Sequence, residues 1–228
     1  FCSCLWLPLG AQTMINMSSI TGDIEITADG YKMGGVLQES SLNPAGYVLT
    51  GTTTSYGVVV APGVTTTLIF NGVNITLTKA MSPLNVSNSN TTIVLKDGTI
   101  NSLVKNGGRC PALQKNGLTG NLTITCEGAL ADPEHHRCDS NCGSLLADAS
   151  TTEHNGGIAS IAADFTIPTN LHDDNVNHPG KYAFANLYVK GGNITAKGGA
   201  HGPGIGSSCV NGFWSDQKSI AKNLHFSG

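Results

Sequence analysis

Charge is scarce in this chain of 228 residues, of which only 12% are Asp, Glu, Lys or Arg. The twelve Lys and Arg residues are scattered among 15 acids, which gives a formal net charge of −3 at pH 7. A protein that binds nucleic acid or an anionic membrane by electrostatics needs a basic patch or stripe. No such cluster occurs here, so the sequence argues against a nucleic-acid partner and against a membrane one.

Helical periodicity is also missing. Glycine (29 residues), threonine, asparagine and serine interrupt the chain every few residues. These residues break helices but suit short strands joined by tight bends. We therefore predict an all-β protein.

What the chain does contain is a repeated unit. Residues 65–78 (TTTLIFNGVNITLT) and 91–103 (TTIVLKDGTINSL) share threonines, an alternating apolar strand, a polar-Gly turn and a second short strand. Weaker copies follow at 121–128, 186–192, 193–199 and 223–228. Apolar residues two positions apart lie on one face of a strand, and such pairs are Leu68/Phe70, Ile93/Leu95, Leu122/Ile124, Leu187/Val189 and Leu224/Phe226.

The spacing of the turn glycines predicts the architecture. Gly98 follows Gly72 by 26 residues and Gly128 follows Gly98 by 30, about the length of one coil of a parallel β-helix. Such units bury their apolar faces by stacking on one another. We predict a single-stranded parallel β-helix, a solenoid; a β-sandwich, which also has evenly spaced short strands, is the structural alternative.

The domain organisation predicted is simple. Residues 1–12 (FCSCLWLPLGAQ) have the composition of the end of a secretory signal peptide, with an N-terminal cap as the alternative. Residues 13–228 form one β-helix domain, which we expect to be truncated at its C-terminal end because the last residues stop at the turn of a repeat unit. Further repeats of the same parent chain are then its neighbours.

Five cysteines lie beyond the first twelve residues, at positions 110, 126, 138, 142 and 209. In an extracellular protein the close pair Cys138/Cys142 could close a small loop, and Cys110/Cys126 could join adjacent coils. The neighbouring His135 and His136 also suggest zinc, whose usual ligands are His and Cys. No second Cys/His pair lies at the distance expected of a zinc finger, so we predict a disulfide-bonded or buried loop.

The residues Asn71-Gly72-Val73-Asn74-Ile75 and Asp97-Gly98-Thr99-Ile100-Asn101-Ser102-Leu103 carry a family resemblance. Residues 60–130 resemble the secreted bacterial carbohydrate-binding domains that fold as a right-handed β-helix akin to pectate lyases. Residues 192–208 (GNITAKGGAHGPGIGSS) are similar to repeats of large secreted and surface proteins with the same fold. The segment 131–180 departs from the pattern.

The resemblance implies a secreted or cell-surface protein that binds plant or microbial cell-wall polysaccharide, with calcium as a plausible companion. Aromatic rings stack on sugar faces, and the candidate rings are Trp214, Tyr182 and Tyr188. Calcium prefers several carboxylate and carbonyl oxygens, which points to Asp173 and Asp174. Asp97, in the turn of the second repeat, is expected to be an Asx-turn residue.

Two alternatives remain open. A polysaccharide lyase needs a base beside a calcium-bound uronate, and a hydrolase needs paired carboxylates across a groove. The sequence shows no such set, so we expect no catalysis. The other alternative is a structural or adhesive shaft of a large surface adhesin, which low charge and abundant Thr, Asn and Gly also suit.

Overall fold

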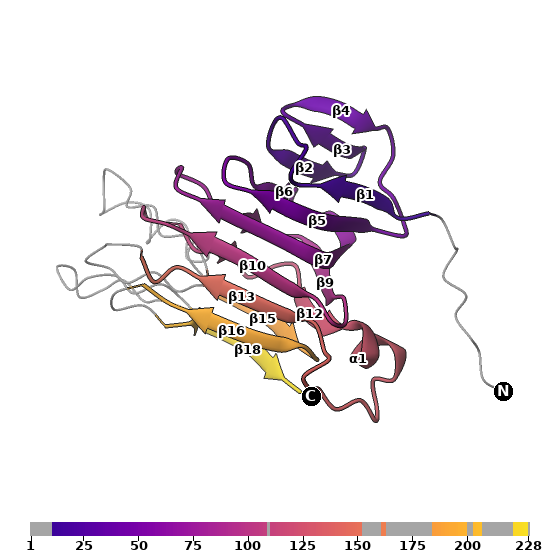
Figure 1. Ribbon diagram of the computed structural model, residues 1–228, viewed down its shortest axis with the longest axis vertical. Coiled ribbons are helices and arrows are strands. Elements are labelled where there is room, and N and C mark those ends of the chain that lie inside the picture. Colours follow the sequence, from indigo (N-terminus) through magenta and orange to yellow (C-terminus); the bar gives the residue numbers. More distant parts are fainter. Residues whose placement is uncertain are drawn as a thin grey trace.

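A computed structural model of the chain describes residues 11–108, 110–151, 161–162, 184–199, 203–206 and 221–227, to which all structural statements below refer. These residues form two sheets, in which most strand pairs are parallel, and one short helix, α1 (Glu127–Ala131). The strands lie one above another along the long axis, from β4 near one end to β18 near the other (Figure 1). The prediction of an all-β protein is confirmed.

The larger sheet has ten strands in the described part of the chain, and all its pairings are parallel. Its strands are β1 (Thr13–Asn16), β5 (Tyr47–Thr53), β7 (Thr65–Leu77), β9 (Asn90–Leu95), β10 (Ile100–Lys105), β12 (Leu122–Cys126), β13 (Ser144–Asp148), β15 (Phe184–Val189), β16 (Asn193–Lys197) and β18 (Ala221–Phe226). The long strand β7 pairs with β9 through its first half and with β10 through its second half. The sheet therefore curls around the core.

The smaller sheet closes the core on another side. Its strands are β2 (Ile24–Thr27), β3 (Gly30–Met33), β4 (Val36–Glu39), β6 (Val58–Val60), β8 (Leu84–Asn85), β11 (Leu113–Gln114), β14 (Ile161–Ala162) and β17 (Ile205–Gly206). The pairings from β2 through β6, β8, β11 and β14 to β17 are parallel, whereas β2, β3 and β4 pair antiparallel at one end.

The core consists of apolar ladders that run through successive repeats. Leu68 of β7 pairs with Ile93 of β9, which pairs with Ile124 of β12, and all three side chains are fully buried. The next inward row is Phe70, Leu95 and Cys126. The strand period of two residues thus brings equivalent positions of the repeats together, and it places a cysteine where the earlier repeats have large apolar residues.

Buried asparagine stabilises the corner between the two halves of the larger sheet. Asn101 accepts hydrogen bonds from the backbone N–H groups of Gly72 (2.9 Å) and Val73 (3.0 Å) and donates one to the carbonyl of Ser144 (3.0 Å). Gly72 has a φ of 72°, which favours glycine. Asp97 forms no Asx turn, because the N–H of Thr99 that such a turn uses donates instead to the carbonyl of Lys96 (3.2 Å), and Oδ1 of Asp97 is buried without a hydrogen-bond partner in the described part of the chain.

Candidate functional site

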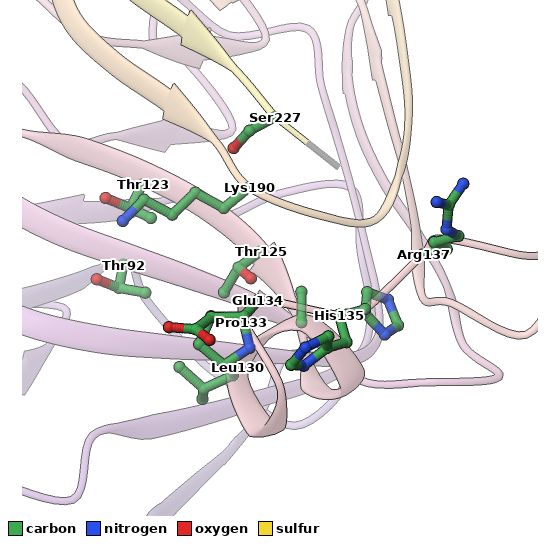
Figure 2. A pocket seen from close by; sticks show the side chains of 12 residues that line it. Thr92, Thr123, Thr125, Leu130, Pro133, Glu134, His135, Arg137, Lys190 and Ser227 are labelled. Carbon is green, nitrogen blue, oxygen red and sulfur yellow. The ribbon is translucent and has the colours of Figure 1, made fainter.

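An open groove lies on the outward face of the larger sheet, beside helix α1. It has a volume of about 970 Å³, and residues in or next to strands of the sheet and residues of the α1 insertion line it. Thr92 of β9 and Thr123 of β12 lie on the sheet, whereas Leu130 and Glu134 belong to α1 and the loop that follows (Figure 2). The groove therefore exists because an insertion between β12 and β13 packs beside the outer face of the sheet.

Outward side chains of the sheet form a row in register. Thr67 pairs with Thr92, Thr92 with Thr123, Thr123 with Tyr188, and Tyr188 with His225. Neighbouring strands lie about 4.8 Å apart, so hydroxyl and ring groups recur at regular intervals along the stack. The rings of Tyr188 and His225 are stacked, with centroids 4.9 Å apart and 5° between their planes.

The groove carries mixed charge. Its ionisable lining residues are Glu134, His135, His136, Arg137 and Lys190, so one carboxylate lines the groove together with several basic groups. His135 also contacts a carboxylate behind it, with 3.1 Å between its Nδ1 and Oδ1 of Asp132. Hydrolysis of a glycosidic bond ordinarily uses two carboxylates on opposite sides of the bond. The described lining of the groove offers one carboxylate, that of Glu134.

Behind the groove, three thiols and one imidazole converge. The ligand atoms of Cys126, His136, Cys138 and Cys142 all lie within 4.8 Å of one another. Nε2 of His136 is 3.3 Å from Sγ of Cys126, 3.2 Å from Sγ of Cys142 and 3.7 Å from Sγ of Cys138. The sulfurs of Cys126 and Cys142 are 3.7 Å apart. Thiolate and imidazole are the donors that transition metals such as zinc prefer.

Burial raises the pKa of the Cys142 thiol to about 12 and also raises the pKa of the Cys126 thiol. Backbone hydrogen bonds from Asp139 to Cys142 and from Ala129 to Cys126 act in the opposite direction. Burial thus favours the protonated form of the Cys126 and Cys142 thiols unless a cation compensates the thiolate charge.

Glycines allow this cluster to assemble. A Cβ atom on Gly128 of α1 would lie 2.4 Å from Cε1 of His136, and one on Gly191 would lie 3.1 Å from Sγ of Cys126. Gly128 was predicted to be a turn glycine of the repeat; it instead belongs to α1, where it makes room for the imidazole ring.

The disulfides predicted from the sequence are absent. Cys126, Cys138 and Cys142 are free thiols, so neither Cys138–Cys142 nor Cys110–Cys126 is bonded. A disulfide requires sulfurs about 2.05 Å apart, whereas the sulfurs of Cys126 and Cys142 are 3.7 Å apart. The physical reason is that strand pairing brings Cys126 to the loop cysteines rather than to Cys110.

Of the predicted binding residues, only Tyr188 lies in the described part of the chain. It is half-buried, and His225 covers one face of its ring. Tyr182, Trp214 and the predicted calcium ligands Asp173 and Asp174 lie outside the described residues, as do residues 1–10.

Cys126 is the site residue that sequence reasoning missed, because it lies in a strand ten residues before His136 and was assigned to a disulfide. The strand register offered a signal: when the repeats are aligned on Ile93 and Ile124, Cys126 occupies the position of Leu95.

The sequence analysis also did not identify two buried lysines. Burial lowers the pKa of Lys105, and it lowers the pKa of Lys115 to about 8.

Comparison with protein-family models, with curated proteins and with solved structures found no match in any of the three. In the described part of the chain, no helix has the length and apolar character needed to cross a membrane. The groove and the thiol–imidazole cluster are therefore the features from which a function can be inferred.

Proposed function

We propose that the protein is a non-catalytic polysaccharide-binding module, secreted or displayed at the cell surface, whose chain forms a single-stranded right-handed parallel β-helix. The observation that carries the proposal is the outward row of Thr67, Thr92, Thr123, Tyr188 and His225, which runs along the stack beside the groove. An extended polymer presents hydroxyl groups at regular intervals, so a row of regularly spaced hydroxyl groups suits it.

The insertion between β12 and β13 forms a wall of the groove beside this row. Lys190 and Arg137 supply positive charge, and Glu134 supplies an acceptor for sugar hydroxyls. Basic groups beside hydroxyls favour a polymer that carries carboxylates, such as a uronate-containing cell-wall glycan. Tyr188 contributes its edge and its hydroxyl, since one ring face is occupied by His225. Trp214, Tyr182 and a calcium ion held by Asp173 and Asp174 remain part of the proposal.

The test is retention of the full chain on a glycan array and on insoluble polysaccharides, with and without added Ca²⁺. Retention without released unsaturated or reducing sugars supports a binding module. Released product supports a lyase or hydrolase instead. A folded protein retained on no polymer favours the shaft of a surface adhesin.

A double variant checks the position of the binding surface. Thr92→Val with Thr123→Val removes two groove hydroxyls but keeps side chains suited to strands. We expect about tenfold weaker binding, since each lost hydrogen bond is worth about 0.5–1.5 kcal/mol. The matched control is Thr76→Val, a half-buried position of β7 that does not line the groove. Equal losses in the double variant and the control would contradict this placement.

A further inference from the structure

The insertion between β12 and β13 has few anchors apart from the thiol–imidazole cluster. Of residues 130–141, only His136 and Cys138 are not exposed. Buried positions flank this stretch at Ala129 and Cys142. A loop that buries so little apolar surface cannot repay its conformational entropy by packing. Three of the four least exposed side chains of the insertion belong to the cluster. A bond through the cluster would therefore order the loop.

The ligand atoms, all within 4.8 Å of one another, are about as close together as those around a single tetrahedral ion. Zinc binds sulfur at about 2.3 Å and imidazole nitrogen at about 2.0–2.1 Å, and a tetrahedron with these lengths puts ligand atoms about 3.6–3.8 Å apart. The Cys126–Cys142 separation is 3.7 Å, and the three separations from Nε2 of His136 lie between 3.2 and 3.7 Å. Distances this short leave room for one ion and not for an iron–sulfur cluster.

Surrounding groups are arranged to support bound thiolates. The backbone N–H of Gly192 donates to Sγ of Cys138 at 3.0 Å, and such donors stabilise the negative charge of a metal-bound sulfur. Asn193 donates from Nδ2 to the carbonyls of Asp139 (2.9 Å) and Cys142 (3.2 Å), which fastens the cysteine loop to the next repeat. Gly128 leaves the space that the His136 ring occupies.

We propose that Cys126, His136, Cys138 and Cys142 bind one Zn²⁺ ion in a closed, tetrahedral, structural site. Four protein ligands leave no position for water or substrate, which distinguishes a structural from a catalytic zinc site. Binding displaces the thiol protons and leaves three thiolates, one neutral imidazole and the ion, with a net charge of −1. The site joins the inner ladder of the sheet to the insertion that forms a wall of the groove.

The first experiment measures metal directly and uses no glycan, so it stands or falls independently of polysaccharide binding. The full chain is produced with zinc in the medium, desalted and analysed for metal content. We expect one zinc per chain, and the reduced protein reconstituted with Co²⁺ should show the intense visible bands of tetrahedral Co²⁺ and a thiolate charge-transfer band. Iron in place of zinc would overturn the assignment, as would reduced, folded protein that binds neither zinc nor Co²⁺.

Variants locate the ion. His136→Ala should lose the zinc equivalent to a competing chelator at more than tenfold lower chelator concentration than wild type does. His135→Ala is the matched control, since it removes a neighbouring imidazole that is not in the cluster, and it should retain zinc as wild type does. Gly128→Ala should also weaken zinc binding, because its Cβ displaces the His136 ring. Equal zinc retention in His136→Ala and His135→Ala, or a Cys126–Cys142 disulfide in the zinc-treated protein, would overturn the site.

Discussion

The same corner of the larger sheet is built in two different ways. From β9 to β10 the chain turns in residues 96–99, and from β12 to β13 it takes residues 127–143. The flanking residues are equivalent, because Leu95 pairs with Cys126 and Ile100 pairs with Ser144. The short corner has a glycine with positive φ, Gly98 at 71°, and is followed by the buried Asn101. The long one has a helix, an exposed loop and the thiol–imidazole cluster.

The difference shows which features belong to the scaffold and which to the site. The four-residue turn satisfies some of its polar groups internally, for example through Thr99, whose Oγ1 donates to the carbonyl of Lys96 at 2.6 Å, whereas the N–H groups of Asp97 and Gly98 donate to Glu127 and Asn141 of the long connection. The longer connection creates a wall beside the sheet but needs an additional bond to hold it. The candidate site is thus built on an insertion whose ends keep the register of the repeat.

The largest effect is expected from exchanging the corners. Replacing residues 127–143 with Lys-Asp-Gly-Thr, together with Cys126→Leu, should give a folded protein, because both ends of the exchanged segment match the register. We expect unchanged far-ultraviolet circular dichroism, complete loss of bound zinc and loss of the groove. An unfolded product would show that the insertion is part of the scaffold and would break the comparison.

A smaller but still large effect is expected at Asn101 in the regular corner. Asn101→Leu leaves two buried N–H groups and one carbonyl without partners, which should lower the free energy of unfolding by about 3 kcal/mol or more. Asn74 is the control, since this half-buried residue accepts a hydrogen bond from Ser102; Asn74→Ala should cost less than about 1 kcal/mol. Urea unfolding measures both, and similar costs would argue that Asn101 has no special role.

The smallest effect concerns pH and the regular repeat. The pKa of Lys115 is lowered from 10.5 to about 8 by burial, and its Nζ donates to the carbonyl of Thr119 at 2.8 Å. Between these two pKa values the unfolded chain binds a proton that the folded chain does not, so this residue makes stability rise with pH by about 1.4 kcal/mol per unit. Below pH 8 both states are protonated and the slope disappears.

Lys115→Met removes this dependence. The cysteines titrate in both proteins, so the difference in unfolding free energy between wild type and variant isolates Lys115. We expect the free energy of unfolding of wild type to rise relative to that of the variant as the pH increases from about 8 to about 10. Parallel pH profiles would mean that the Lys115 ammonium is not desolvated in the folded protein.

Much of the scaffold could be predicted from the sequence. Leu68, Phe70, Ile93 and Leu95 alternate with polar residues, and all four are fully buried as expected. Residues 127–143 do not follow the repeat, and no periodicity indicated the helix. Phe226, predicted to face inward, is 60% exposed in the described structure, because β18 is the last described strand of its sheet and only β15 pairs with it.

The candidate site was harder to predict, for a reason visible in Cys126. Sequence spacing alone connects Cys138 with Cys142 and leaves Cys126 ten residues from His136, which suits neither a zinc finger nor an obvious loop closure. Whether these residues meet depends on where α1 turns the chain and on the space left at Gly128. Neither the direction of the chain after α1 nor the space at Gly128 can be predicted from the local sequence pattern.

By itself the sequence determined that this chain is made of short strands, that its repeats stack in parallel and that it carries little charge. These properties follow from side-chain alternation and turn residues, which act over a few positions. Only the tertiary structure decided that Cys126 meets His136, Cys138 and Cys142, and that threonines from separate repeats line one groove. Such contacts arise from strand register and from the route of an insertion, which bring together residues that are distant in the chain.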